Sequence, residues 1–294
     1  MNKLLSAEFI RLFKSLVFKL CLLFSAGLAV LISLLRYADV KKNADFYAQY
    51  SSEYVTTDGL IFVGALYLIF AFAALIGIFI GTEYHDGTLR NKLTAGHTRC
   101  SIYLSKLLVC VGANVMIHVL FLLLMIALRI VLFHGAPNNA VSTLLQFGAA
   151  SSAAVAALTA LLLLLSMLIP SKAVGSVACL LTAVVMLFAT LTIYNKLAAP
   201  EYYYEENGTT FAFYDEETKE LNAPEASPVK NPGYLAGSKR KFFEFLNDFL
   251  PVSQLYQIAQ KHPDDLGMMA VYDGVILIAA AGVGMAIFKK KNLK

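Results

Sequence analysis

Long apolar segments alternate with short polar ones along the whole 294-residue chain. A segment of roughly 20 apolar residues is the length that an α-helix needs to cross the ~30 Å hydrocarbon core of a bilayer. The fold class predicted is therefore an all-α polytopic membrane protein. Six spans are expected, at Leu16–Leu35, Leu60–Ile80, Tyr103–Phe133, Thr143–Ile169, Ala173–Tyr194 and Leu266–Phe288.

A shorter amphipathic pattern comes before the first span, in residues 1–15. Leu5, Phe9 and Leu12 recur there at helical spacing, whereas charged residues such as Glu8 fall mostly elsewhere. This pattern predicts an interfacial helix on the inner membrane surface. The alternative interpretation is that these residues are simply the inner end of the first span.

The largest polar segment separates the fifth and sixth spans and predicts a small α+β insert on the outer side. Two β-prone runs flank Asn207-Gly208, which favours a two-residue hairpin, and a helical pattern that follows is interrupted at Pro251. The predicted organisation is an interfacial helix, five spans, the insert, and a sixth span with a basic tail, at residues 1–15, 16–194, 195–265 and 266–294.

Composition and charge agree with a membrane protein and indicate its orientation. Residues are 58% hydrophobic and only 15% charged, whereas soluble domains carry about 25% charged residues. Lysine and arginine dominate the short loops on one side, and acidic residues are concentrated in the outer segments. We expect a multi-pass protein of a bacterial plasma membrane with both termini in the cytoplasm. Its expected surroundings are the lipid bilayer, with no nucleic acid partner.

The loop between the second and third spans is dense in charge and carries signals for a short helix. Asp86 is a candidate N-cap, Gly96 a candidate C-terminal stop, and Thr98 a candidate cap for the next helix. Leu89 and Leu93 are four residues apart and share a face. An isolated two-turn helix is marginal in water, so this one is expected to pack against its own bundle or a partner.

The same loop, residues 82–102, resembles the loop after the second span in permease subunits of ABC-2-type exporters. Those permeases carry a glutamate, then "GT-R-K", then "G-R", then an "LSK"-like entry to the third span. The six-span plan extends the resemblance more loosely over the whole chain. The corresponding residues here are Glu83, Gly87, Thr88, Arg90, Lys92, Gly96, Arg99 and Leu104-Ser105-Lys106.

In that family the loop is a coupling helix that docks on a separate ATP-binding subunit. The sequence has no GxxxxGK[ST] motif, so ATP and magnesium are expected in a cytoplasmic ATPase subunit, with no cofactor, metal or catalytic residue in this chain. A second permease copy, or a related permease, is implied as well. The alternative interpretation is an ordinary basic loop whose charges only set topology. The resemblance implies an ATPase-coupling interface at Glu83, Asp86, Gly87, Thr88, Arg90, Lys92, Gly96 and Arg99.

Four polar residues fall inside the predicted spans. Asn114, His118 and Arg129 lie on one narrow face of the third span, and Asp273 lies in the sixth at a depth similar to that of Arg129. Because a charge at the bilayer centre is unfavourable, we hypothesise an ion pair between Arg129 and Asp273. The polar face either lines a substrate path or holds helices together, and we favour the second interpretation.

Small residues mark the second span for close packing. Ala73, Gly77 and Gly81 recur at every fourth position near its inner end, which favours a tight contact within the bundle or between subunits.

The function that best fits these features is a transporter permease that exports an amphipathic peptide, a drug or a lipid-like molecule. A non-transporting sensor or immunity protein with a ligand-binding outer segment is the main alternative. An intramembrane enzyme would need clustered histidine or carboxylate side chains, and His118 with one asparagine is too little.

Overall fold

The computed structural model describes residues 2–47, 60–134, 140–206, 209–211, 228–260, 263 and 265–291. In these ranges, six helices are long and apolar enough to cross a membrane, which confirms the predicted number of spans. As predicted, the third is the longest, with 35 residues. The six helices are α2 (Leu16–Lys42), α5 (Gly64–His85), α7 (Arg99–Phe133), α8 (Val141–Leu168), α9 (Lys172–Leu197) and α12 (Leu266–Lys290).

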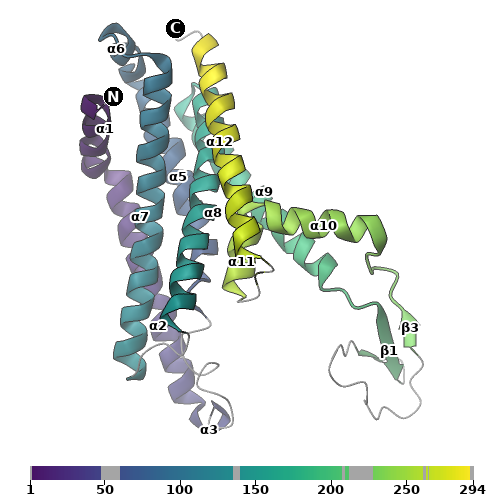
Figure 1. Cartoon of the computed structure of the whole chain (residues 1–294). Helices are drawn as coiled ribbons and strands as arrows, with labels where there is room; N and C mark the ends of the chain where they lie inside the picture. The colour runs from purple at the N-terminus through teal and green to yellow at the C-terminus, as the bar shows by residue number, and fades with distance from the viewer. Residues whose placement is uncertain are drawn as a thin grey trace.

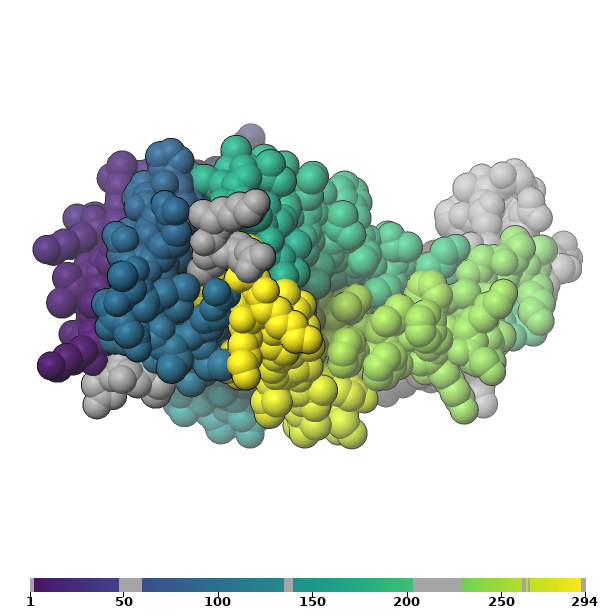
Figure 2. Space-filling view, turned by 90° about the horizontal axis from the view of Figure 1, so that it is seen from above, coloured from purple at the N-terminus to yellow at the C-terminus, as the bar shows by residue number. Residues whose placement is uncertain are grey.

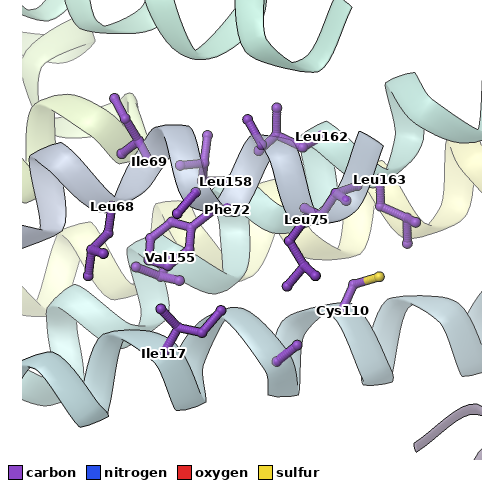
Figure 3. Close-up of a cluster of buried hydrophobic side chains, with 14 of the residues drawn as sticks. Leu68, Ile69, Phe72, Leu75, Cys110, Ile117, Val155, Leu158, Leu162 and Leu163 are labelled. Atoms are coloured by element: carbon purple, nitrogen blue, oxygen red, sulfur yellow. The ribbon is translucent and has the colours of Figure 1, made fainter. Parts of the chain in front are cut away.

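Helices α5 and α8 form the centre of the bundle and are the most buried of the six (Figure 1). Both contact α7 and α9, while α2 packs on α5 and α7, and α12 packs on α7 and α8. Figure 3 shows the core that results, in which Phe72 and Leu75 of α5 meet Ile117 of α7 and Leu158 and Leu162 of α8. Close packing of such side chains holds the spans together in lipid.

Two glycines bring α9 unusually close to α5. A Cβ placed on Gly77 would lie 2.6 Å from the Cα of Ser176, and one on Gly81 would lie 2.9 Å from the Cα of Lys172. Only residues without a side chain allow the two backbones to approach in this way. The small-residue pattern of the second span is therefore a helix contact within the bundle.

Two short helices, α1 (Asn2–Lys14) and α6 (Thr88–Thr94), lie at one end of the bundle, which we call the α6 end. The first and last described residues also lie at this end (Figure 1). Figure 2 looks onto it and shows α1, the region of α6 and the start of α7, and the end of α12 side by side.

Three shorter helices lie away from the α6 end: α3 (Ala44–Tyr47) at the opposite end, and α10 (Gly237–Phe249) and α11 (Pro251–Ala259) beside the start of α12 (Figure 1). Helix α10 lies across the ends of α9 and α12, whereas α11 is buried against α8, α9 and α10 (Figure 1). The break between α10 and α11 falls directly before Pro251, as the sequence predicts.

A three-stranded antiparallel sheet lies beyond α10, in the order β2-β1-β3. Glu206 pairs with Thr209, so two residues connect β1 to β2; the predicted turn at 207–208 lies outside the described residues. The strands are β1 (Tyr202–Glu206), β2 (Thr209–Phe211) and β3 (Pro228–Lys230).

Candidate functional site: a buried ionic network at the α6 end

The chain enters α6 through a left-handed glycine. Helix α5 continues to His85, past the predicted end of the second span, so only Asp86 and Gly87 separate it from Thr88. Gly87 has φ 65°, which glycine adopts without strain, and the start of α6 has no side-chain cap. The prediction that Asp86 caps α6 is wrong, because Asp86 ends α5 and its Oδ1 lies 3.0 Å from His85 Nδ1.

The exit from α6 follows the prediction. Gly96 has φ 87°, its N–H donates to Leu93 O at 2.9 Å, and the N–H of His97 donates to Lys92 O at 3.1 Å. This pair of bonds is the Schellman motif that ends many helices. Thr98 then caps α7 by accepting a backbone N–H at 3.2 Å. Both connections of α6 are therefore short and geometrically fixed.

One face of α6 packs on the bundle and the other faces away from it. Leu89 is buried in the core and Leu93 packs against it, as their spacing predicts. Arg90 and Asn91 are exposed. A hollow of about 520 Å³ opens next to this region, lined by His85, Pro170, Ser171, Lys172, Ala173 and Ser176. The α6 end thus offers a polar, partly concave surface.

Behind α6, two carboxylates and three cations form a buried ionic network. Glu8 of α1 and Glu83 of α5 are each 1% exposed, and Lys106 of α7 is 0% exposed. Lys92 Nζ of α6 lies 2.8 Å from Glu83 Oε1 and also pairs with Glu8. Lys106 Nζ pairs with both carboxylates. The network therefore joins α1, α5, α6 and α7.

Arg11 completes the ionic network. Its guanidinium pairs with Glu83, donates from Nη2 to Phe79 O at 2.8 Å, and lies 4.2 Å from the centroid of the Phe79 ring. Lys106 Nζ lies 5.3 Å from the same centroid, so the ring attracts two of the cations. Because three cations face two carboxylates, the network has an excess of one positive charge.

The charged partners keep Glu8 ionised. Burial raises the pKa of this carboxyl, but the ammonium groups of Lys106 and Lys92 outweigh burial, so the pKa of Glu8 lies below its ordinary value of 4.5. A carboxyl with a lowered pKa stabilises the fold above its unfolded-state pKa and stops doing so as pH falls through the folded-state value. At neutral pH, Glu8 therefore makes its full contribution to the stability of the fold.

Sequence reasoning misses Glu8 and does not assign Lys106 a pairing role. The available signal is spacing, because Leu4, Glu8 and Leu12 are four residues apart and share one helix face. All three are buried, and α1 packs on α7, which carries Lys106. A glutamate within an apolar row of this kind needs a cation opposite it.

A second set of contacts fixes the end of α12. Arg99 donates to the carbonyl oxygen of Phe288 at 3.0 Å and also to that of Lys291. These hydrogen bonds cap the C-terminus of α12. Lys291 Nζ donates to Met167 O at 2.7 Å and to Tyr84 Oη at 2.9 Å. The start of α7 and the ends of α5, α8 and α12 are therefore tied together.

The predicted coupling residues thus occupy three kinds of position. Asp86 and Arg90 have exposed charged side chains, and Gly87 and Gly96 form the turns. Thr88 Oγ1 donates to the Glu83 carbonyl at 3.3 Å. The side chains directed into the bundle are those of Glu83, Lys92 and Arg99.

Asn114 and His118 connect α7 to α8. Asn114 Nδ2 donates to Thr159 Oγ1 at 2.9 Å, and His118 Nε2 lies 2.9 Å from Ser151 Oγ. All four residues are fully buried. These contacts support the interpretation that the polar face holds helices together.

The predicted ion pair between Arg129 and Asp273 is wrong. Both Asp273 oxygens are buried without a hydrogen-bond partner in the described part of the chain, and the Arg129 guanidinium lies 5.9 Å from the Phe133 ring centroid. Helices α7 and α12 meet near the α6 end, where Tyr103 Oη donates to Ala280 O at 3.3 Å, and they separate toward the opposite end (Figure 1). With Tyr103 opposite Ala280, Asp273 lies level with the middle of α7, whereas Arg129 lies near the far end of that helix. The prediction of similar depth is therefore wrong as well.

Comparison with known proteins gives one finding on relationship. A family model described as "ABC-2 family transporter protein" matches residues 4–190, which include the whole ionic network and α6. No curated protein matches the chain.

Proposed function

The chain belongs to the ABC-2 family of transporter proteins, and from this membership we propose that it is the permease subunit of an ATP-binding cassette exporter. The cargo would be an amphipathic peptide, a drug or a lipid-like molecule. ATP and magnesium would be bound by a separate ATPase subunit, since the sequence has no phosphate-binding loop motif. We propose further that the α6 end faces the cytoplasm and that two permease chains pair in the membrane.

The observation that carries this proposal is the ionic network. Lys92 connects α6 to Glu83 of α5 and Glu8 of α1, and Lys106 connects both carboxylates to α7. Fixed turns on both sides of α6 and buried charges behind it give the loop little freedom to move alone. A force on α6 would therefore move α1, α5 and α7 as a unit, which is what a coupling element requires.

The exposed side of α6 is the surface on which the ATPase would dock. Arg90 and Asn91 are exposed there, and the hollow lined by His85 and Lys172 lies next to it. Rotation of the paired bundles between two states would then carry the cargo outward.

Co-purification tests the partnership. The full-length protein would be extracted in mild detergent from its own cells, and the co-purifying chains identified by mass spectrometry. An ATPase with a phosphate-binding loop is expected, and ATP-dependent movement of a fluorescent amphipathic peptide should follow when both are placed in vesicles. Absence of any such ATPase would overturn the proposal, and peptide binding without flux would favour the sensor or immunity alternative.

Arg90→Ala tests the docking surface. We expect roughly tenfold weaker binding of the ATPase, the effect of about 1.4 kcal/mol, with an unchanged melting temperature because the side chain is exposed. Binding would be measured by titration of the ATPase onto permease in nanodiscs. Lys14→Ala removes an exposed cation from α1 and is the matched control, for which unchanged binding is expected. Equal losses in both variants would point to general charge attraction instead of docking on α6.

A further inference from the structure

Helix α11 is a short, buried helix that carries three polar side chains into the bundle. Ser253, Gln254 and Gln257 are all buried, and Ser253 Oγ lies 3.0 Å from Thr190 Oγ1 of α9. Gln257 Nε2 donates to Asn247 O at 3.0 Å, which ties α11 to α10. Most buried polar atoms in proteins have a hydrogen-bond partner, so a buried amide atom without one needs an explanation.

Gln254 has no donor left for the side chain beside it. Its Nε2 carries two hydrogens and donates to Asp248 O at 2.7 Å and to Met269 O at 3.4 Å. Its Oε1 is buried and has no partner within the described ranges. The neighbouring side chain is that of Asp273, one turn along α12 from Met269.

If Asp273 is ionised, both of its carboxylate oxygens can only accept hydrogen bonds, and so can the neighbouring Gln254 Oε1. Asp273 is 3% exposed, and neither carboxylate oxygen has a hydrogen-bond partner among the residues described. Three acceptor atoms would then face one another with no donor, and the negative charge would be buried without compensation. An uncompensated buried carboxylate is strongly unfavourable and is ordinarily neutralised by a proton.

Among the residues that the structure describes, the elements packed against α12 offer no counter-ion to Asp273. Helix α8 has no ionisable side chain at all, and on α12 itself Asp265 accepts from the N–H groups of Gly267 and Met268. Tyr272 packs against aromatic rings of α10. The titratable or charged groups on the buried part of α7 are Tyr103, which donates to Ala280 O; Lys106, which pairs with Glu8 and Glu83; Cys110; His118, which bonds Ser151; and Arg129, which lies over Phe133. Asp248 of α10 accepts from Gln257, and Tyr256 of α11 packs on Tyr194.

We infer that Asp273 holds a proton and donates it in a hydrogen bond to Gln254 Oε1, which fastens α11 to α12. One proton removes the buried charge and supplies the donor that both unpartnered groups need. Asp273 is thus a proton-binding site where α11 meets α12, and its ionisation would remove this hydrogen bond between the two helices. This inference does not depend on the proposed transport function.

Infrared spectroscopy of the full-length protein in nanodiscs tests it. At neutral pH the wild-type protein should give the carbonyl band of a protonated carboxylic acid, and Asp273→Asn should lack it. Asp265→Asn is the matched control and should leave the band unchanged, because Asp265 caps the same helix from an exposed position. Asp273→Asn should keep the wild-type melting temperature within a few degrees, since its amide can donate to Gln254.

A second variant assigns the infrared band to Asp273, and two outcomes would contradict the inference. Gln254→Met removes the acceptor and should move the same band to the position of a carboxylic acid without a hydrogen bond, which identifies the band even if Asp273→Asn does not fold. A wild-type protein without the band would overturn the inference. So would a melting temperature that rises with sodium chloride in the wild type and not in Asp273→Asn, because the site would then hold a cation.

Discussion

Glu83→Gln is expected to abolish ATP-driven transport and to lower the free energy of unfolding by about 3–5 kcal/mol. The substitution keeps the shape of the side chain and removes its charge. Three cations would then share the single carboxylate of Glu8, and Lys106 is 0% exposed, so water does not solvate its charge. ATP-dependent flux in vesicles measures the loss of transport, and unfolding in mild detergent measures the loss of stability.

The double variant Glu83→Gln/Lys106→Met separates stability from coupling. It restores the original excess of one positive charge, so it should be more stable than Glu83→Gln alone. Transport should remain low, because the link between α5 and α7 is still missing. Glu244→Gln on α10 is the matched control: the same substitution is made at a side chain that is 47% exposed and lies outside the ionic network, and little change in either property is expected. Wild-type transport by Glu83→Gln would contradict a role of the ionic network in coupling.

Gly77→Ala is expected to destabilise the bundle by about 1–3 kcal/mol, and Gly77→Val by more. The new methyl group would meet the backbone of α9, at 2.6 Å from the Cα of Ser176. A backbone atom cannot turn aside as a flexible side chain can, so α5 and α9 would have to move apart. The melting temperature and the yield of the purified protein would measure the loss.

Gly282→Ala is the control for the change in helix propensity. Gly282 lies in α12, and a Cβ built there meets nothing within 4 Å. Alanine favours a helix over glycine by about 1 kcal/mol, so this variant should be neutral or slightly more stable. If both alanine variants behave alike, close approach of α5 and α9 is not what Gly77 provides.

Local signals in the sequence predict the local features of this fold. Apolar runs of sufficient length predict the six spans, and Gly96, Thr98 and Pro251 predict where helices end and begin, because each acts through its own backbone or its nearest neighbours. The position of Asp86 shows the limit of such reasoning. It has the chemistry of a cap, but packing extends α5 to His85 and leaves Gly87 to make the turn.

Pairings between distant segments are beyond the sequence pattern. Glu8 and Lys106 are 98 positions apart, and only the packing of α1 on α7 brings them together. The failed pairing of Arg129 with Asp273 has the same origin. Counting residues from the outer end of each predicted span gives the two residues equal depth, but α7 extends well beyond the start of α12, so those two ends are not level (Figure 1).

The number of residues between Glu8 and Lys106 also determines when their contact can form during synthesis. At about 5–20 residues per second, roughly 5–20 seconds pass between translation of Glu8 and translation of Lys106, 98 positions later. Through that interval the first helix has no completed binding place and waits for the third span to insert. If that insertion failed, Glu8 and Glu83 would both lack their contact with Lys106. The N-terminal helix would then stay unpacked, and membrane quality-control proteases could recognise it.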